Sequence, residues 1–236
     1  MANIITITSR LIPPAVALAC AIAAPGMLGQ GTPLGAAPSF PSKPAYEKED
    51  RALNEAFRAI MRRLDAAMKR ELQENSREWI RHRDYLCGYQ AAMRLGKDDA
   101  RDDEYYQCLR DLTRDRTAYI RAAFGKTSAP SGVDGAYGDG FGGVMTLRTH
   151  TDGSVHFTIE VVRGPTFHLG SISGDIAVRG GTAEFREKEP CAGDGCCRIE
   201  FAFGKHWIDV REHACAYHHG ARAFFDGRYR RVGKTP

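Results

Sequence analysis

The chain has 236 residues, of which 43% are hydrophobic and 26% charged, and its formal net charge is +4. This length suits one or two domains with a hydrophobic core, and the composition is that of a globular protein rather than a disordered chain. Because basic and acidic residues nearly balance, charge alone does not favour binding to nucleic acid or another polyanion.

The N-terminal segment predicts an export signal. Arg10 precedes an apolar run over residues 11–24, which is too short to span a bilayer but suits the hydrophobic core of a signal peptide. Ala21 and Ala23 supply the small residues of a cleavage site. We therefore expect residues 1–24 to be a signal peptide and the mature protein to be periplasmic or secreted.

A lipid anchor at Cys20 is the alternative for this segment. The three residues before it, Ala17, Leu18 and Ala19, make a poor lipobox, so we favour the cleaved signal peptide. We expect no transmembrane segment in the mature protein.

Six cysteines remain after the signal peptide, and an even number in an oxidising compartment favours disulfides over a metal site or catalysis. They are Cys87, Cys108, Cys191, Cys196, Cys197 and Cys215.

A helical domain is expected over residues 47–126, after a flexible proline-rich tether at residues 25–46. Its apolar residues recur at the helical period, and Asp65 can cap a second helix. Polar residues 97–101 separate that helix from a third, whose acidic start complements the helix dipole.

After a linker at residues 127–134, the apolar period changes from 3.6 to 2 and predicts an antiparallel β domain over residues 135–236. The pair Asp152 and Gly153 is a hairpin turn signal. Residues 135–137 and 227–229 are expected to be first and last strands that pair with each other, because closure removes exposed edges. The last strand lies in the run over residues 224–232, and the other expected strands are residues 144–150, 155–162, 167–171, 175–178, 182–186, 197–203 and 207–212.

Two spaced motifs lie on the second and third predicted helices. They are Trp-x3-Arg-Asp-x2-Cys, formed by Trp79, Arg83, Asp84 and Cys87, and Cys-Leu-x2-Leu-Thr-x2-Arg, formed by Cys108, Leu109, Leu112, Thr113 and Arg116. In this order they resemble the helical domain of the LprI-type lysozyme inhibitors, a group of exported bacterial proteins. The resemblance covers about residues 50–124 and implies a lysozyme-type partner.

The motif also has a physical interpretation. Trp79, Arg83 and Cys87 are spaced four apart and so share one helix face, and a bridge from Cys87 to Cys108 would join the two helices. Such a bridge stabilises a fold by about 2 to 4 kcal/mol. The expected fold class is therefore α+β in two domains, a disulfide-stapled three-helix domain followed by a small antiparallel β-barrel or sandwich of about eight strands.

An arginine on an apolar face needs a partner, which Asp84, Asp111 or carbonyls at a helix end could provide for Arg83. We interpret Trp79, Arg83, Asp84 and Arg116 as mainly structural. The alternative is that some of them form a partner-binding edge.

Cysteines and histidines cluster in the β domain, but their spacing lacks the Cys-x2-Cys knuckle of a zinc site. Cys197 is in phase with inward-facing residues, so a bridge to Cys215 is plausible, which leaves Cys191 to pair with Cys196, or the crossed alternative. A nucleophilic Cys215 beside His213 or His219 would lack a recognisable oxyanion hole. We expect no catalytic residue, metal or cofactor.

The favoured hypothesis is a non-enzymatic inhibitor that binds a lysozyme-type peptidoglycan hydrolase. Such hydrolases carry two carboxylates in the cleft, so a cationic turn is a natural plug. The candidate turns contain Lys205, His206, His218, His219 and Arg222.

Charge steering does not support this hypothesis. Many lysozymes are basic, so an inhibitor attracted to them by charge should be acidic, whereas the expected mature chain has 32 basic and 29 acidic residues. The alternative is an envelope adaptor or binding module for a small ligand, a peptidoglycan fragment or a protein partner.

Overall fold

The computed structural model describes residues 40–97, 101–125, 132–189, 191 and 195–234. The predicted signal peptide at residues 1–24, with Cys20, lies outside the described residues, as do residues 25–39 of the predicted tether and most of the predicted linker.

Three helices form the first part of the described chain: α1 (Lys43–Met61), α2 (Ala66–Leu95) and α3 (Asp103–Phe124). Aspartates cap the N-termini of α2 and α3. The carboxylate of Asp65 accepts a hydrogen bond from Met68 N at 2.9 Å, and that of Asp102 accepts one from Tyr105 N at 2.7 Å. The predicted tether extends too far, because α1 already begins at Lys43, with a proline in its first turn where the missing N–H costs no helical hydrogen bond.

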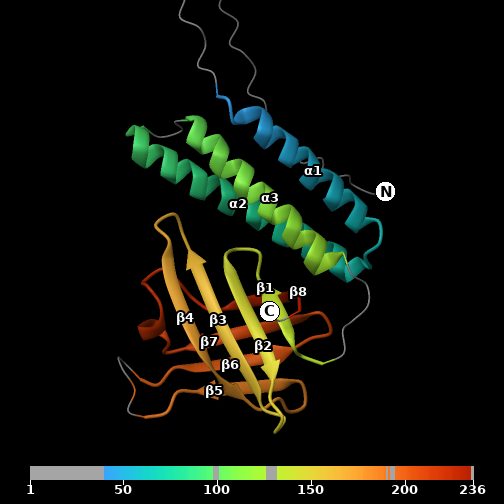
Figure 1. Cartoon of the computed structure of the whole chain (residues 1–236), viewed down its shortest axis with the longest axis vertical. Helices are drawn as coiled ribbons and strands as arrows, with labels where there is room; N and C mark the ends of the chain where they lie inside the picture. Colours follow the sequence, from blue (N-terminus) through green and yellow to red (C-terminus); the bar gives the residue numbers. More distant parts are fainter. Residues whose placement is uncertain (1–39, 98–100, 126–131, 190, 192–194, 235–236) are drawn as a thin grey trace, which may run out of the picture. The chain divides into compact units, whose positions relative to one another are not determined.

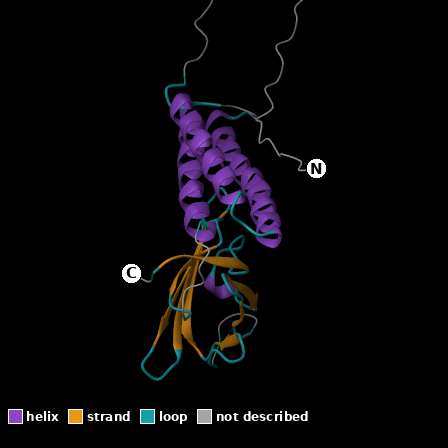
Figure 2. Cartoon of the chain, turned by 90° about the vertical axis from the view of Figure 1, so that its right-hand side faces the viewer, coloured by secondary structure: helices purple, strands orange, loops and turns teal. Residues whose placement is uncertain are grey.

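The helices lie alongside one another (Figures 1 and 2) and bury two apolar clusters. The larger cluster joins all three helices through Ala56, Ile60, Leu64, Leu72, Ile120, Ala123 and Phe124. The smaller one surrounds Cys87 with Tyr106 and Leu109. No helix in the described part of the chain combines the length and apolar character needed to cross a membrane.

Eight antiparallel strands follow and form one sheet. They are β1 (Gly135–Gly138), β2 (Gly143–Thr149), β3 (Val155–Arg163), β4 (His168–Ile176), β5 (Thr182–Arg186), β6 (Arg198–Phe203), β7 (Trp207–His213) and β8 (Gly227–Gly233). The strand order is β4-β3-β2-β1-β8-β7-β6-β5, so β1 pairs with β8, as the sequence predicts. The sheet curls into a nearly closed barrel, in which β2 to β4 cross β5 to β7 at a steep angle (Figure 1).

The barrel is open between β4 and β5, the two ends of the sheet order. Aromatic side chains fill this seam: the rings of Phe157 and Phe185 lie 5.2 Å apart and those of Phe157 and Phe201 5.1 Å apart. Gly174 in β4 leaves room for Phe185, since a Cβ there would lie 2.3 Å from the ring.

This packing corrects one prediction. Residues 167–171 and 175–178 are not two strands but belong largely to a single strand, β4, which pairs with β3 from Arg163↔His168 to Val155↔Ile176. The sequence Ser173-Gly174 does not turn the chain, because the glycine serves side-chain packing instead.

Candidate functional site

Trp79 in α2 is the centre of the spaced motif that resembles the LprI-type inhibitors. The guanidinium carbons of Arg83 and Arg116 lie 5.2 Å and 5.4 Å from its ring, and all three side chains are buried. Guanidinium groups stack on indole rings through cation–π attraction, which is strongest where water is excluded. The two arginines therefore fix the indole ring inside the helical domain.

Arg83 has Asp84 as its hydrogen-bond partner. Its Nε and Nη2 donate to Oδ1 of Asp84 at 2.9 Å and 2.7 Å, and Nη1 lies 3.9 Å from the carboxylate of Asp50. Burial raises the pKa of Asp50, and the charge of Arg83 acts against that shift. Of the partners expected for Arg83, Asp111 instead binds Arg110 and Arg114.

Arg116 in α3 is buried, and no carboxylate of the described residues forms an ion pair with it. Its Nη2 donates to Asn75 Oδ1 at 2.7 Å and to Ser76 Oγ at 3.2 Å. Burial lowers the pKa of Arg116 to about 10, because a charged group loses its hydration there. The main role of this residue is to bind α3 to α2.

The remaining motif residues also face inward. Leu109 and Thr113 are buried and Leu112 is partly buried. The disulfide Cys87–Cys108, with Cα atoms 5.7 Å apart, covalently joins α2 to α3. The buried motif residues thus pack between α2 and α3, whereas the carboxylate of Asp84 is exposed.

The outward face of α2 next to this disulfide carries an apolar stripe. Tyr85 and Met93 are 51% and 69% exposed, and Tyr89 lies between them, its ring 6.1 Å from that of Tyr85. The spacing of four residues places all three on one side of the helix. Exposed tyrosine and methionine are enriched in protein interfaces. We call Tyr85, Tyr89 and Met93 the α2 stripe.

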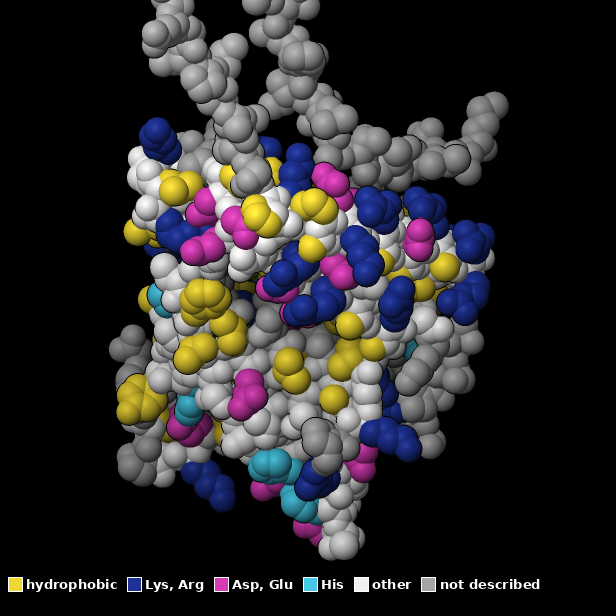
Figure 3. All heavy atoms as spheres, turned by 45° about the horizontal axis from the view of Figure 1, so that its top comes forward, with side chains coloured by type: hydrophobic (Ala, Val, Ile, Leu, Met, Phe, Trp, Pro, Cys, Tyr) yellow, Lys and Arg dark blue, Asp and Glu magenta, His cyan; other side chains and the backbone are white. Residues whose placement is uncertain are grey.

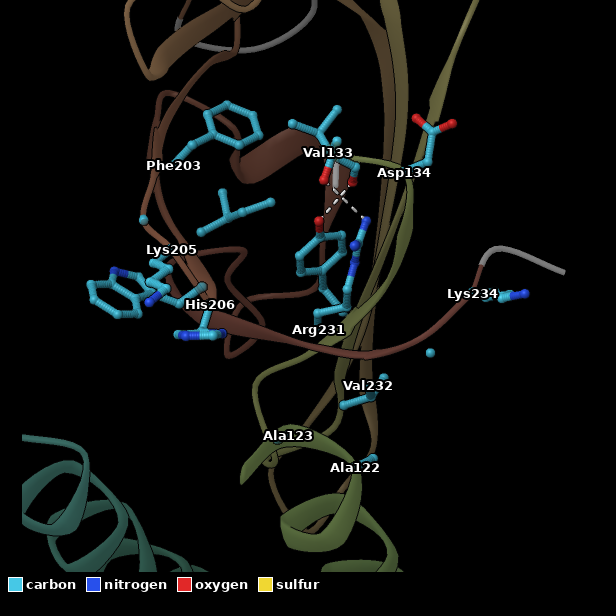
Figure 4. A pocket seen from close by; sticks show the side chains of 16 residues that line it. Ala122, Ala123, Val133, Asp134, Phe203, Lys205, His206, Arg231, Val232 and Lys234 are labelled. Carbon is cyan, nitrogen blue, oxygen red and sulfur yellow. Dashed lines mark hydrogen bonds between the residues drawn. The ribbon is translucent and has the colours of Figure 1, made fainter. Parts of the chain in front are cut away.

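A pocket of about 490 Å³ opens where β1, β8 and the β6–β7 turn meet the end of α3. Lys205 and His206 lie on one side of it, and Arg231 and Asp134 on the other (Figure 4). The guanidinium of Arg231 stacks on Tyr137 at 5.4 Å and donates to Gly132 O at 3.4 Å, while Tyr137 Oη donates to Val133 O at 2.6 Å. Apolar side chains such as Val133, Phe203 and Ile208 therefore line the pocket together with cationic groups and the carboxylate of Asp134.

The sequence-predicted turn residues divide into two groups in the structure. Lys205 and Arg222 are exposed and His206 is half-buried in the pocket wall. Burial lowers the pKa of His206, assisted by the charge of Lys205, and both effects favour the neutral ring.

The other two histidines do not form an exposed cationic turn, contrary to the expectation. His219 is almost buried, with Nε2 3.0 Å from Oε1 of Glu212, and Nε2 of His218 lies 3.3 Å from Oε1 of Glu187. The 3-10 turn at Ala216–His218 carries these side chains back onto the barrel, where carboxylates bind them.

The four cysteines of the β domain form two disulfides. Cys197 pairs with Cys215 inside the barrel, and Cys191 pairs with Cys196. The barrel core therefore has a covalent bond between the residue that precedes β6 and the segment that follows β7.

Sequence reasoning missed a buried ion pair in the Gly-rich stretch that follows β1. Nη2 of Arg163 lies 2.5 Å from Oδ2 of Asp139, and Oδ1 of Asp139 accepts hydrogen bonds from Phe141 N and Gly143 N at 2.7 Å and 2.9 Å. A lone carboxylate among four glycines was the available signal, because a glycine-rich segment can wrap its N–H groups around an anion. The pair shapes this end of the barrel.

Comparison with curated proteins and with solved structures finds no match to this chain. A family model described as Lysozyme inhibitor LprI matches residues 41–120. The matched segment covers α1 and α2 entirely and most of α3, including both spaced motifs and the Cys87–Cys108 disulfide. Over residues 41–120, about a third of the sequence, this chain is therefore similar to the LprI lysozyme inhibitor family.

Proposed function

We propose that this protein is an exported, non-enzymatic inhibitor that binds a lysozyme-type peptidoglycan hydrolase. The observation that carries the proposal is the family match over residues 41–120, within which both motifs and their disulfide occur together. The remaining chain forms a barrel that this match does not cover, so binding is assigned first to the helical part.

Three disulfides support a location outside the cytoplasm. Cys87–Cys108, Cys191–Cys196 and Cys197–Cys215 use all six cysteines of residues 40–236. Disulfides persist in the periplasm and outside the cell and are rare in a reducing cytosol. The periplasm also gives access to hydrolases that act on peptidoglycan.

The α2 stripe is the proposed contact surface. It lies within the matched segment, and its tyrosines offer large amphipathic area at a low cost in side-chain entropy. The buried motif residues Trp79, Arg83 and Arg116 cannot reach a partner directly. They hold α2 and α3 in place behind the stripe.

A lysozyme turbidity assay tests the proposal. The mature protein is added at increasing molar ratio to lysozymes of several types, at low and at physiological salt. We expect stoichiometric loss of lysis for at least one type. Undiminished lysis by all types would eliminate inhibition.

The same assay locates the surface. The double variant Tyr85→Ala and Met93→Ala should weaken inhibition by about tenfold or more, since losing two interface anchors costs about 2 kcal/mol or more. Tyr217→Ala is the matched control, because Tyr217 is a 72% exposed tyrosine outside the matched segment. If inhibition were lost only in Lys205→Ala, the contact surface would instead be the β6–β7 turn of the barrel.

The pocket favours a second candidate function, a binding module for a small anionic ligand such as a peptidoglycan fragment. Its volume of about 490 Å³ suits a small molecule, and Lys205, Arg231 and Lys234 around it would attract carboxylates. Calorimetric titration with a muramyl dipeptide is the test. Binding that is lost in the Lys205→Ala, Lys234→Ala double variant would support it, and no heat of binding in the unaltered protein would reject it.

A further inference from the structure

Two histidines and one aspartate converge on the outer surface of the barrel. His156 lies in β3, Asp175 in β4, and His150 just after β2 at the start of the hairpin turn. The strand register pairs His156 directly with Asp175, and His150 N donates to Ser154 O across the same hairpin. Three adjacent strands therefore bring these side chains to one point.

The donor atoms are already close to metal-binding distances. Nδ1 of His156 lies 2.8 Å and Nε2 of His150 lies 3.3 Å from Oδ1 of Asp175, and all three ligand atoms lie within 4.8 Å of one another. Around a tetrahedral ion with bonds of about 2.0 to 2.1 Å, ligand atoms are about 3.3 Å apart. Small side-chain rotations of these exposed groups would meet that requirement.

We propose that His150, His156 and Asp175 form a surface site for a divalent transition-metal ion, of which Zn²⁺ is the natural probe. Two imidazoles with one carboxylate are a donor set that zinc and its neighbours in the first transition row accept. Three protein ligands leave a coordination position open to water or to a donor from a bound partner.

The surroundings fit an ion of this kind. Asp152 in the hairpin turn adds a second negative charge near His150, and hydrogen bonds from Ser154 hold its carboxylate in place. Arg148 pairs with His156 in the strand register, and its positive charge disfavours cation binding. Salt screens this repulsion in part. Figure 3 shows histidine side chains next to acidic ones on one face of the molecule.

A simple surface ion pair is the competing interpretation, and the chain contains one for comparison. His213 lies with Nε2 3.5 Å from Oε1 of Glu200, equally exposed but without a second histidine. Of the groups of acidic, histidine and cysteine side chains in the described residues, His150, His156 and Asp175 alone gather three donors at this spacing.

The test is zinc titration of the oxidised, chelator-treated mature protein at pH 7.5 and physiological salt, followed with a competing zinc indicator. We expect one equivalent to bind, and His150→Gln, His156→Gln and Asp175→Asn each to weaken binding by about tenfold or more, since even outer-shell substitutions cost 10- to 100-fold. His213→Gln should bind as the unaltered protein does. Far-UV circular dichroism checks that each variant is folded.

Histidine NMR provides a readout that needs no variant. Zinc should shift the ring resonances of His150 and His156 and leave those of His213 unchanged. No bound zinc, equal binding by all the variants, or shifts confined to other histidines would overturn the proposal. Failure here would leave lysozyme inhibition untouched, because the site lies outside residues 41–120.

Discussion

Glu71 in α2 and Arg230 in β8 form a bidentate ion pair that joins the helices to the barrel across 159 residues of sequence. Nε of Arg230 donates to Oε1 of Glu71 at 2.8 Å, and Nη2 donates to Oε2. Arg230 is 1% exposed, and its guanidinium also stacks on Phe124 of α3 at 4.2 Å. The helical part and the barrel thus share a buried charged contact.

Glu71→Gln should lower the free energy of unfolding by about 2 to 3 kcal/mol, because it leaves the buried guanidinium of Arg230 without a countercharge. Urea denaturation, followed by tryptophan fluorescence, measures the change. Glu78→Gln on the same helix is exposed and should alter stability by less than about 0.5 kcal/mol. Equal effects of the two changes would contradict the structural role of the pair.

Arg116→Lys should destabilise the fold by about 1 to 2 kcal/mol, since an ammonium group cannot stack on Trp79 as a planar guanidinium does. Thermal denaturation measures the loss, with Arg114→Lys on the exposed side of α3 as the control. If the motif is structural, the folded variant keeps its inhibitory stoichiometry. A variant of normal stability that no longer inhibits would instead make Arg116 a contact residue.

Removing the Cys87–Cys108 disulfide by a double change to alanine should cost about 3 kcal/mol, whereas removing Cys191–Cys196 should cost about 2 kcal/mol. The reason is loop length, because the bridges close sequence separations of 21 and 5 residues, and the longer loop restricts the unfolded chain more. Denaturant midpoints of the two double variants give the comparison. The opposite ranking would show that local packing outweighs the loop entropy.

The fold should lose stability above about pH 10. Burial raises the pKa values of Tyr119 and Tyr229 in the folded protein, so their contribution is complete below the unfolded tyrosine pKa of about 10 and is lost as pH rises beyond it. Arg116 acts in the opposite direction, since its folded pKa is lowered to about 10 and its deprotonation favours the folded state above that pH. Because two tyrosines lose their contribution and one arginine gains, the folded state loses stability on balance above about pH 10.

Urea midpoints at pH 8 and pH 11 measure this loss. Tyr119→Phe removes one of the two groups and should reduce the difference between the midpoints. Tyr217→Phe changes an exposed tyrosine and should leave the difference as it is. Stability that stays level from pH 8 to pH 11 would be inconsistent with these burial effects.

Local sequence determines much of the architecture. The two aspartate caps, the 3.6-residue period and the change to a period of 2 each depend on neighbouring residues. The sequence alone therefore predicts the helices and the strands. The pairing of β1 with β8 was also predicted, although in the structure it joins the two halves of the sheet and leaves the sheet edges at β4 and β5. The motif spacing likewise indicated the family of the helical part.

Contacts between distant residues required the folded structure. No local pattern indicates that Gly174 lies under Phe185 rather than in a turn, that Glu71 finds Arg230, or that Glu212 binds His219 and removes it from the surface. The same holds for the meeting of His150, His156 and Asp175. Sequence determined the elements and the resemblance of the helical part to the LprI family, because these depend on spacing along the chain. The tertiary structure alone decided which charges are buried, which are exposed and which converge, because strand register and helix docking set those distances.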